Sequence, residues 1–163
     1  MWYRILSAAL ALTLAQPVSA LSCLRPDVIR QYEQARDSDD LYSMVIGTIA
    51  ATPPIAIPEP DANGNYPDGA KADTKIRVTG RELTGTGFAA DFDREVIVRA
   101  RCLSVWCASA PEAGQDVFLT LRHADDDLLL EISPCPTNAL PWSADDEARV
   151  LNCHRFQKCT ASE

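Results

Sequence analysis

The sequence has few basic residues and almost no histidine. Lys and Arg together number 15 against 23 Asp and Glu, a formal net charge of −8, and no Lys/Arg-rich run is present. Nucleic-acid binding needs clustered cations to neutralise phosphates, so this composition argues against it. Only two histidines occur in 163 residues, and the G-x-S-x-G, H-E-x-x-H and P-loop motifs are absent. We therefore expect a protein that is not an enzyme.

The remaining groups with catalytic or metal-binding chemistry have simpler explanations. His123 lies beside the acidic run 125–127, which is typical of a solvated surface turn. The segment 61–65 (DANGN) begins like a calcium-binding EF-hand loop. However, Tyr66 stands where such a loop needs Gly, and Ala72 where it needs a bidentate Glu. We expect turns at both places, and neither a metal nor a cofactor.

Long hydrophobic runs are also scarce. The run from Ile5 to Leu14 is free of charge but only ten residues long, whereas a membrane-spanning helix needs about 20 apolar residues. Arg4 precedes the run and the small residues 18–20 follow it. This pattern predicts a secretory signal peptide over residues 1–20 and a single domain over residues 21–163. We expect an exported bacterial protein, periplasmic or secreted, without a membrane span.

Six cysteines are present, all of them beyond the predicted signal peptide. An even number in an exported chain predicts three disulfides, whereas a zinc site would favour C-x2-C spacing. Proximity in the sequence favours Cys102–Cys107 and Cys153–Cys159, each of which closes a short local loop. The long-range bridge that remains is Cys23–Cys135. In a lipoprotein Cys23 would be acylated, but Ala20 stands where a leucine is expected.

The remaining pattern predicts a mainly β protein. Expected in order are a helix over 26–37, a strand over 41–51, a loop over 52–74, strands over 75–83, 94–103, 116–122 and 128–132, and a helix over 143–152. Pro26 suits a first helical position and Ser143 suits an N-cap. The loop contains five prolines and two turn dipeptides, which exclude regular structure. Short strands without β-α-β alternation favour a sandwich or a small closed barrel.

The order of these features resembles a known family. The features are Cys23, Pro26 and a short helix, a strand ending Val45-Ile46-Gly47, then Cys135, Pro141-Trp142, a helix, His154-Arg155-Phe156-Gln157 and Cys159. Together they resemble the netrin-like domain, in particular the N-terminal domain of tissue inhibitors of metalloproteinases. The resemblance implies a five-stranded OB-type closed barrel with a short N-terminal helix and a C-terminal helix, stapled by disulfides.

The resemblance also bears on function. Those inhibitors begin Cys-x-Cys, and the α-amine and carbonyl of the first residue bind the zinc of the protease. Here Cys23 matches the second cysteine, while Leu21 stands at the place of the first. The amine and carbonyl remain, but the disulfide that clamps them is missing. We therefore expect a non-catalytic domain that binds another protein or a cell-envelope component. Metalloproteinase inhibition through Leu21 is the alternative, and an unrecognised extracytoplasmic enzyme is a third hypothesis.

A binding surface is predicted from a few apolar residues in polar or terminal surroundings. Family members contact partners through a long first inter-strand loop, which corresponds to 52–74 here. Trp106 lies between two cysteines, where it either anchors a ligand or plugs one end of the barrel. The candidate surface residues are Leu21, Ser22, Ile55, Ile57, Tyr66 and Trp106.

Overall fold

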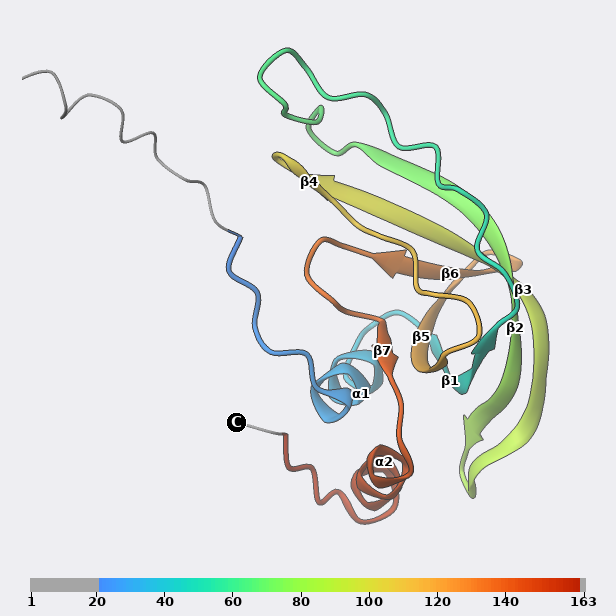
Figure 1. Ribbon diagram of the computed structural model, residues 1–163. Helices are drawn as coiled ribbons and strands as arrows, with labels where there is room; N and C mark the ends of the chain where they lie inside the picture. Colours follow the sequence, from blue (N-terminus) through green and yellow to red (C-terminus); the bar gives the residue numbers. More distant parts are fainter. Residues whose placement is uncertain (1–20, 162–163) are drawn as a thin grey trace, which may run out of the picture.

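The computed structural model describes residues 21–161, so the predicted signal peptide lies outside the described residues. This part of the chain is mainly β with two helices (Figure 1). In order, the elements are α1 (Val28–Arg36), β1 (Tyr42–Ile49), β2 (Lys71–Thr84), β3 (Gly87–Leu103), β4 (Trp106–Cys107), β5 (Asp116–Ala124), β6 (Asp127–Ile132), β7 (Ala139–Pro141) and α2 (Ala144–Phe156).

Five strands pair into a closed ring in the order β1-β2-β3-β6-β5, with β5 returning to β1. The β3–β6 pairing is parallel, and the other pairings of the ring are antiparallel. The short strands β4 and β7 lie outside the ring and pair with β3 and β5. Figure 1 shows α1 and α2 at one end of the molecule and the loop between β1 and β2 at the other. We call these the helical end and the loop end.

Apolar side chains form two clusters on opposite faces of the strands. Val45 of β1 and Leu119 of β5 belong to a cluster with members from all five ring strands, which fills the space they enclose. Their neighbours Ile46 and Phe118 point the other way, into a cluster shared with both helices. This is the alternation expected of strands that are covered on both faces. The ring is therefore filled on the inside and covered by helices at the helical end.

One pair of glycines permits a close approach between β1 and β2. Gly47 lies directly opposite Gly80. A Cβ atom added to Gly47 would collide with the carbonyl oxygen of Thr79, and one added to Gly80 with that of Ile46. The lack of a side chain at both positions lets the two backbones cross tightly.

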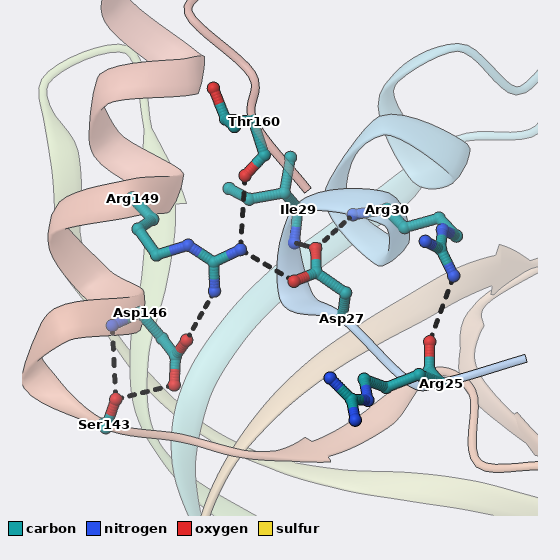
Figure 2. Close-up of polar contacts among 8 residues, drawn as sticks. All are labelled: Arg25, Asp27, Ile29, Arg30, Ser143, Asp146, Arg149 and Thr160. Carbon is teal, nitrogen blue, oxygen red and sulfur yellow. Dashed lines mark hydrogen bonds and ion pairs between the residues drawn. The ribbon is translucent and has the colours of Figure 1, made fainter. Parts of the chain in front are cut away.

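Helix α1 begins at Val28, so the prediction that Pro26 occupies its first position is wrong. Asp27 is the N-cap: its Oδ1 accepts hydrogen bonds from the backbone N–H groups of Ile29 (2.9 Å) and Arg30 (3.2 Å). Its Oδ2 accepts a hydrogen bond of 2.7 Å from Arg149 of α2, a residue 122 positions away (Figure 2). A single buried carboxylate therefore starts one helix and ties it to the other.

Helix α2 starts as predicted, since the Ser143 hydroxyl accepts the Asp146 N–H at 3.2 Å. It runs four residues beyond the predicted end, to Phe156, and stops where Gln157 adopts a left-handed conformation (φ 55°). The added turn includes His154, whose Nε2 lies 3.0 Å from the carbonyl oxygen of Thr84 in β2. This contact stabilises the last turn of α2. Its polar residues do not continue the amphipathic pattern, so the pattern alone does not predict them to be helical.

Two strands begin earlier than predicted, and two short ones were missed. Strand β2 starts at Lys71, inside the predicted loop, and β3 at Gly87. The residues added to β3 bury Phe88 and Phe92, whereas those added to β2 are held by a cross-strand ion pair. Asp73 accepts hydrogen bonds from Arg99 at 2.7 and 2.8 Å. The missed strands β4 and β7 have two and three residues, too few for a periodic signal.

Candidate functional site

The six cysteines form the three predicted disulfides, Cys23–Cys135, Cys102–Cys107 and Cys153–Cys159. The first joins the segment before α1 to the connection between β6 and β7, across 112 residues. The second closes the turn between β3 and β4, and the third ties the last turn of α2 to the tail after it. No cysteine in the described part of the chain is free, so none of them offers a thiolate nucleophile.

The two histidines make hydrogen bonds to neighbouring strands or helices. His123 lies in β5, where its Nε2 is 2.9 Å from the Ser43 hydroxyl of β1. The expectation of a solvated turn histidine is therefore wrong, because β5 extends to Ala124 and the turn follows it. His154 lies 3.0 Å from the Tyr32 hydroxyl through Nδ1. Each ring thus helps to fasten one element to another.

The candidate calcium segment is folded as a turn around its first residue. The Asp61 carboxylate accepts the N–H groups of Asn63 and Asn65, both at 2.8 Å. Among residues 21–161, one group of three potential metal ligands lies close together: Glu33, Cys153 and Cys159. The two cysteines are bonded to each other, so this group offers a metal no thiolate.

The structure brings Tyr66 next to the disulfide-closed turn that contains Trp106. The Tyr66 N–H donates to the carbonyl oxygen of Ser104 (2.9 Å), and the Ser104 hydroxyl donates to the Asn65 side chain (3.3 Å). The Cys102 N–H donates to the carbonyl oxygen of Ala70 (2.9 Å). The end of the long loop is therefore fixed along the turn by hydrogen bonds.

Two further apolar side chains lie on that turn. Leu103 is 58% exposed and Val105 40% exposed. Trp106 is partly exposed, and it is not among the side chains packed against either cluster of the described residues. We call Tyr66, Leu103, Val105 and Trp106 the Trp106 surface. Sequence reasoning missed Leu103 and Val105, although the charge-free run between the two cysteines was a signal for them.

The other predicted surface residues lie elsewhere. Ile55 is partly buried and packs against the cluster inside the ring. With Ile57 it lines a cavity of about 500 Å³ beside the segment 108–113. Leu21 is half-buried and Ser22 is exposed, both next to the segment that leads into α1. Of the six predicted residues, therefore, Tyr66 and Trp106 belong to two separate segments that are hydrogen-bonded to each other.

A second cavity, of about 310 Å³, lies between the segment before α1, the first turns of α1 and the residues after Cys135. Gln31 lines it and is only 4% exposed. The Gln31 Nε2 donates to the Phe118 carbonyl and the Thr120 hydroxyl, both at 3.3 Å. Its Oε1 is the one buried side-chain polar atom without a hydrogen-bond partner among the described residues. Such an unpaired group costs about 1–3 kcal/mol.

No protein-family model, no curated protein and no solved structure matches this chain. Neither helix of residues 21–161 is long and apolar enough to cross a membrane. The chemistry of its surfaces is therefore the basis for assigning a function.

Charge is distributed differently over two of these surfaces. Strands β2 and β3 carry a series of ion pairs: Asp73–Arg99, Lys75–Glu95 and Arg77–Asp93. Hydrogen bonds from the arginines hold the pKa values of Asp73 and Asp93 below the usual range. The loop 50–70 carries the acids Glu59, Asp61 and Asp68, contains no basic residue, and makes no ion pair within the described part of the chain. The β2–β3 surface is neutralised internally, and the loop end is not.

Proposed function

We propose that this chain is an exported, non-catalytic binding domain of the netrin-like type, and that its strand ring is an OB-type barrel. The closed strand order, the apolar interior, the helix before β1 and the helix after β7 support this fold. Three disulfides are typical of proteins that fold in an oxidising compartment, which supports export. The partner is another protein or a component of the cell envelope.

The Trp106 surface is the observation that carries this proposal. Its aromatic and aliphatic groups lie on a short turn that is closed by a disulfide and braced by the Tyr66 and Cys102 backbone hydrogen bonds. Anchors that are fixed before binding lose little conformational entropy when a partner orders them. Large apolar and aromatic side chains of this kind dominate the energy of protein interfaces.

The acids of the loop define the chemistry of the partner. Glu59, Asp61 and Asp68 lie on the same loop as Tyr66 and have no basic neighbour on it. Opposite charges across an interface accelerate association and select against wrong partners. The complementary surface on the partner is therefore cationic, with an apolar recess for the Trp106 ring.

Affinity capture from the extracytoplasmic fraction of the source cell tests this function. The bait is the disulfide-bonded chain, with Leu103→Ser/Trp106→Ser as the binding variant. Leu41→Ser is the matched control, since Leu41 is 67% exposed at another place. We expect a partner that the unchanged chain and Leu41→Ser retain, that the double variant loses, and whose binding weakens as salt rises. Equal recovery by all three baits would contradict the assignment of this surface.

A further inference from the structure

The cavity beside α1 is not used by the proposed function, and its lining has the features of a ligand site. It lies at the helical end and is closed on one side by the Cys23–Cys135 disulfide. The Trp106 surface belongs to the loop end, so the two sites share no residue. Its lining includes apolar side chains, a buried amide and two guanidinium groups, together with the Asp27 carboxylate and several neutral polar groups.

The apolar part of the lining consists of Leu24, Pro136 and Leu140. Leu24 is 80% exposed, although it lies directly after the disulfide-bonded Cys23. Leu140, in contrast, is buried and belongs to the cluster beneath the helices. A small aliphatic side chain in the cavity would lie between the two and cover apolar surface that is now exposed.

The amide of Gln31 sets the polar requirement. Its Nε2 is already occupied by Phe118 and Thr120, which fixes the orientation of the amide. The unpartnered Oε1 can only accept a hydrogen bond. A ligand atom that satisfies it must therefore be an N–H or O–H donor, and because Oε1 is buried, the donor reaches it only when the groups that cover it move aside.

The charge of the lining is set by Arg30. One of its N–H groups donates to the carbonyl oxygen of Arg25 at 3.0 Å, and the guanidinium extends away from Asp27 (Figure 2). No carboxylate of residues 21–161 forms an ion pair with Arg30. Asp27 is the acid in the lining, and Arg149 and two backbone N–H groups occupy its oxygens. Although the chain has a net charge of −8, this cavity therefore offers a positively charged group to which an anion can bind.

We infer that the cavity binds the carboxyl end of a peptide with an aliphatic last residue. The α-carboxylate pairs with Arg30, the amide N–H of the last residue donates to Gln31 Oε1, and the side chain packs between Leu24 and Leu140. Such a ligand supplies a carboxylate, a neighbouring N–H and an aliphatic side chain, which match the guanidinium, the amide oxygen and the apolar groups of the lining. A free N-acyl amino acid carries the same groups.

Titration of the disulfide-bonded, ¹⁵N-labelled chain with short peptides, followed by NMR, tests this site. The probe is N-acetyl-Ala-Ala-Leu, and its C-terminal carboxamide is the matched control. We expect signals of residues 22–34 and 135–140 to shift, and the carboxamide to bind at least tenfold more weakly. N-acetyl-leucine distinguishes the source: equal affinity assigns recognition to a single acylated residue, and much weaker binding assigns it to a peptide.

Two changes test the named contacts. Arg30→Gln should weaken binding at least tenfold, while Arg94→Gln, which removes an exposed arginine from β3, should leave it unchanged. Methylation of the leucine nitrogen removes the N–H and should also weaken binding tenfold, without any change to the protein. The inference is overturned if the probe does not bind, if the carboxamide binds equally well, or if neither change has an effect. The Trp106 surface is untouched by these changes, so its function stands or fails separately.

Discussion

The helical end and the loop end of this protein are fastened by different groups. At the helical end, side chains distant in sequence join the elements: Asp27 to Arg149, Tyr32 to His154, and His154 to Thr84. At the loop end, backbone groups do so: the Tyr66 N–H bonds to Ser104 and the Cys102 N–H to Ala70. The covalent bridge there is a local disulfide across five residues, and the Ser104 hydroxyl adds a hydrogen bond to the Asn65 side chain.

This difference gives the polar side chains of the two ends different roles in the fold. Polar side chains at the helical end are used to hold the fold together, so changing them should destabilise it. At the loop end the backbone makes the connections, which leaves Tyr66, Leu103 and Trp106 available to a partner.

The largest effect is expected from removing the long-range disulfide. Cys23→Ser/Cys135→Ser opens a loop of more than a hundred residues, for which loop-closure entropy predicts a loss of about 5 kcal/mol. Urea unfolding of the oxidised proteins measures this loss. A loss no larger than that for the local Cys102–Cys107 bridge would show that the helical end does not depend on its distant connections.

A smaller loss is expected for Asp27→Ala. The change removes an N-cap and leaves the half-buried Arg149 without its nearest partner, at a cost of about 3 kcal/mol. Asp27→Asn keeps a cap but loses the charge, so it should fall between the variant and the unchanged chain. Asp39→Ala is the control, because Asp39 is an exposed acid in the turn after α1. If Asp27→Ala unfolds at the same urea concentration as this control, the buried pair contributes nothing.

Removing the disulfide of the loop end should cost less. Cys102→Ser/Cys107→Ser opens a loop of only a few residues, for which the same entropy model gives about 2 kcal/mol. The turn should nevertheless become mobile, with amide exchange rising at 102–107 but not in α1 or α2. Exchange rising equally at both ends would show that the two ends are one cooperative unit.

The smallest effect on stability is expected at the Trp106 surface itself. Leu103→Ser should change the free energy of unfolding by less than about 0.5 kcal/mol, since the side chain is mostly exposed. Binding to the captured partner, measured by calorimetry, should weaken strongly in the same variant. A large loss of stability would mean that Leu103 serves the fold.

Sequence reasoning predicted the elements with clear local signals. Ser143 marks the start of α2, prolines mark the loop after β1, and cysteine spacing gives all three pairings. Strand β2 begins earlier than predicted because Asp73 pairs with Arg99 across the hairpin, and only the register shows which charges meet. Strand β3 begins earlier because Phe88 and Phe92 are buried, and two aromatic residues in a mixed segment give no clear periodic signal. Four of the six candidate surface residues lie apart from the Trp106 surface for a similar reason: tertiary packing, as at Ile55, decides which apolar loop residues are covered. The unpartnered Gln31 oxygen depends on the position of α1 against β5, which no local pattern encodes.

Closure of the strand ring also has a consequence for how the chain folds. Strand β1 pairs with β5, and β3 pairs with β6 in the parallel direction. The ring therefore requires contacts between segments far apart in the sequence. Such contacts form slowly, because the entropy of closing long loops is lost before they are made. The two local disulfides join cysteines five and six residues apart, whereas Cys23 and Cys135 are separated by 112 residues. We expect this long-range bridge to form only after α1 docks on β5. Formation of this bridge, followed by thiol trapping during oxidative refolding, would therefore time the completion of the ring.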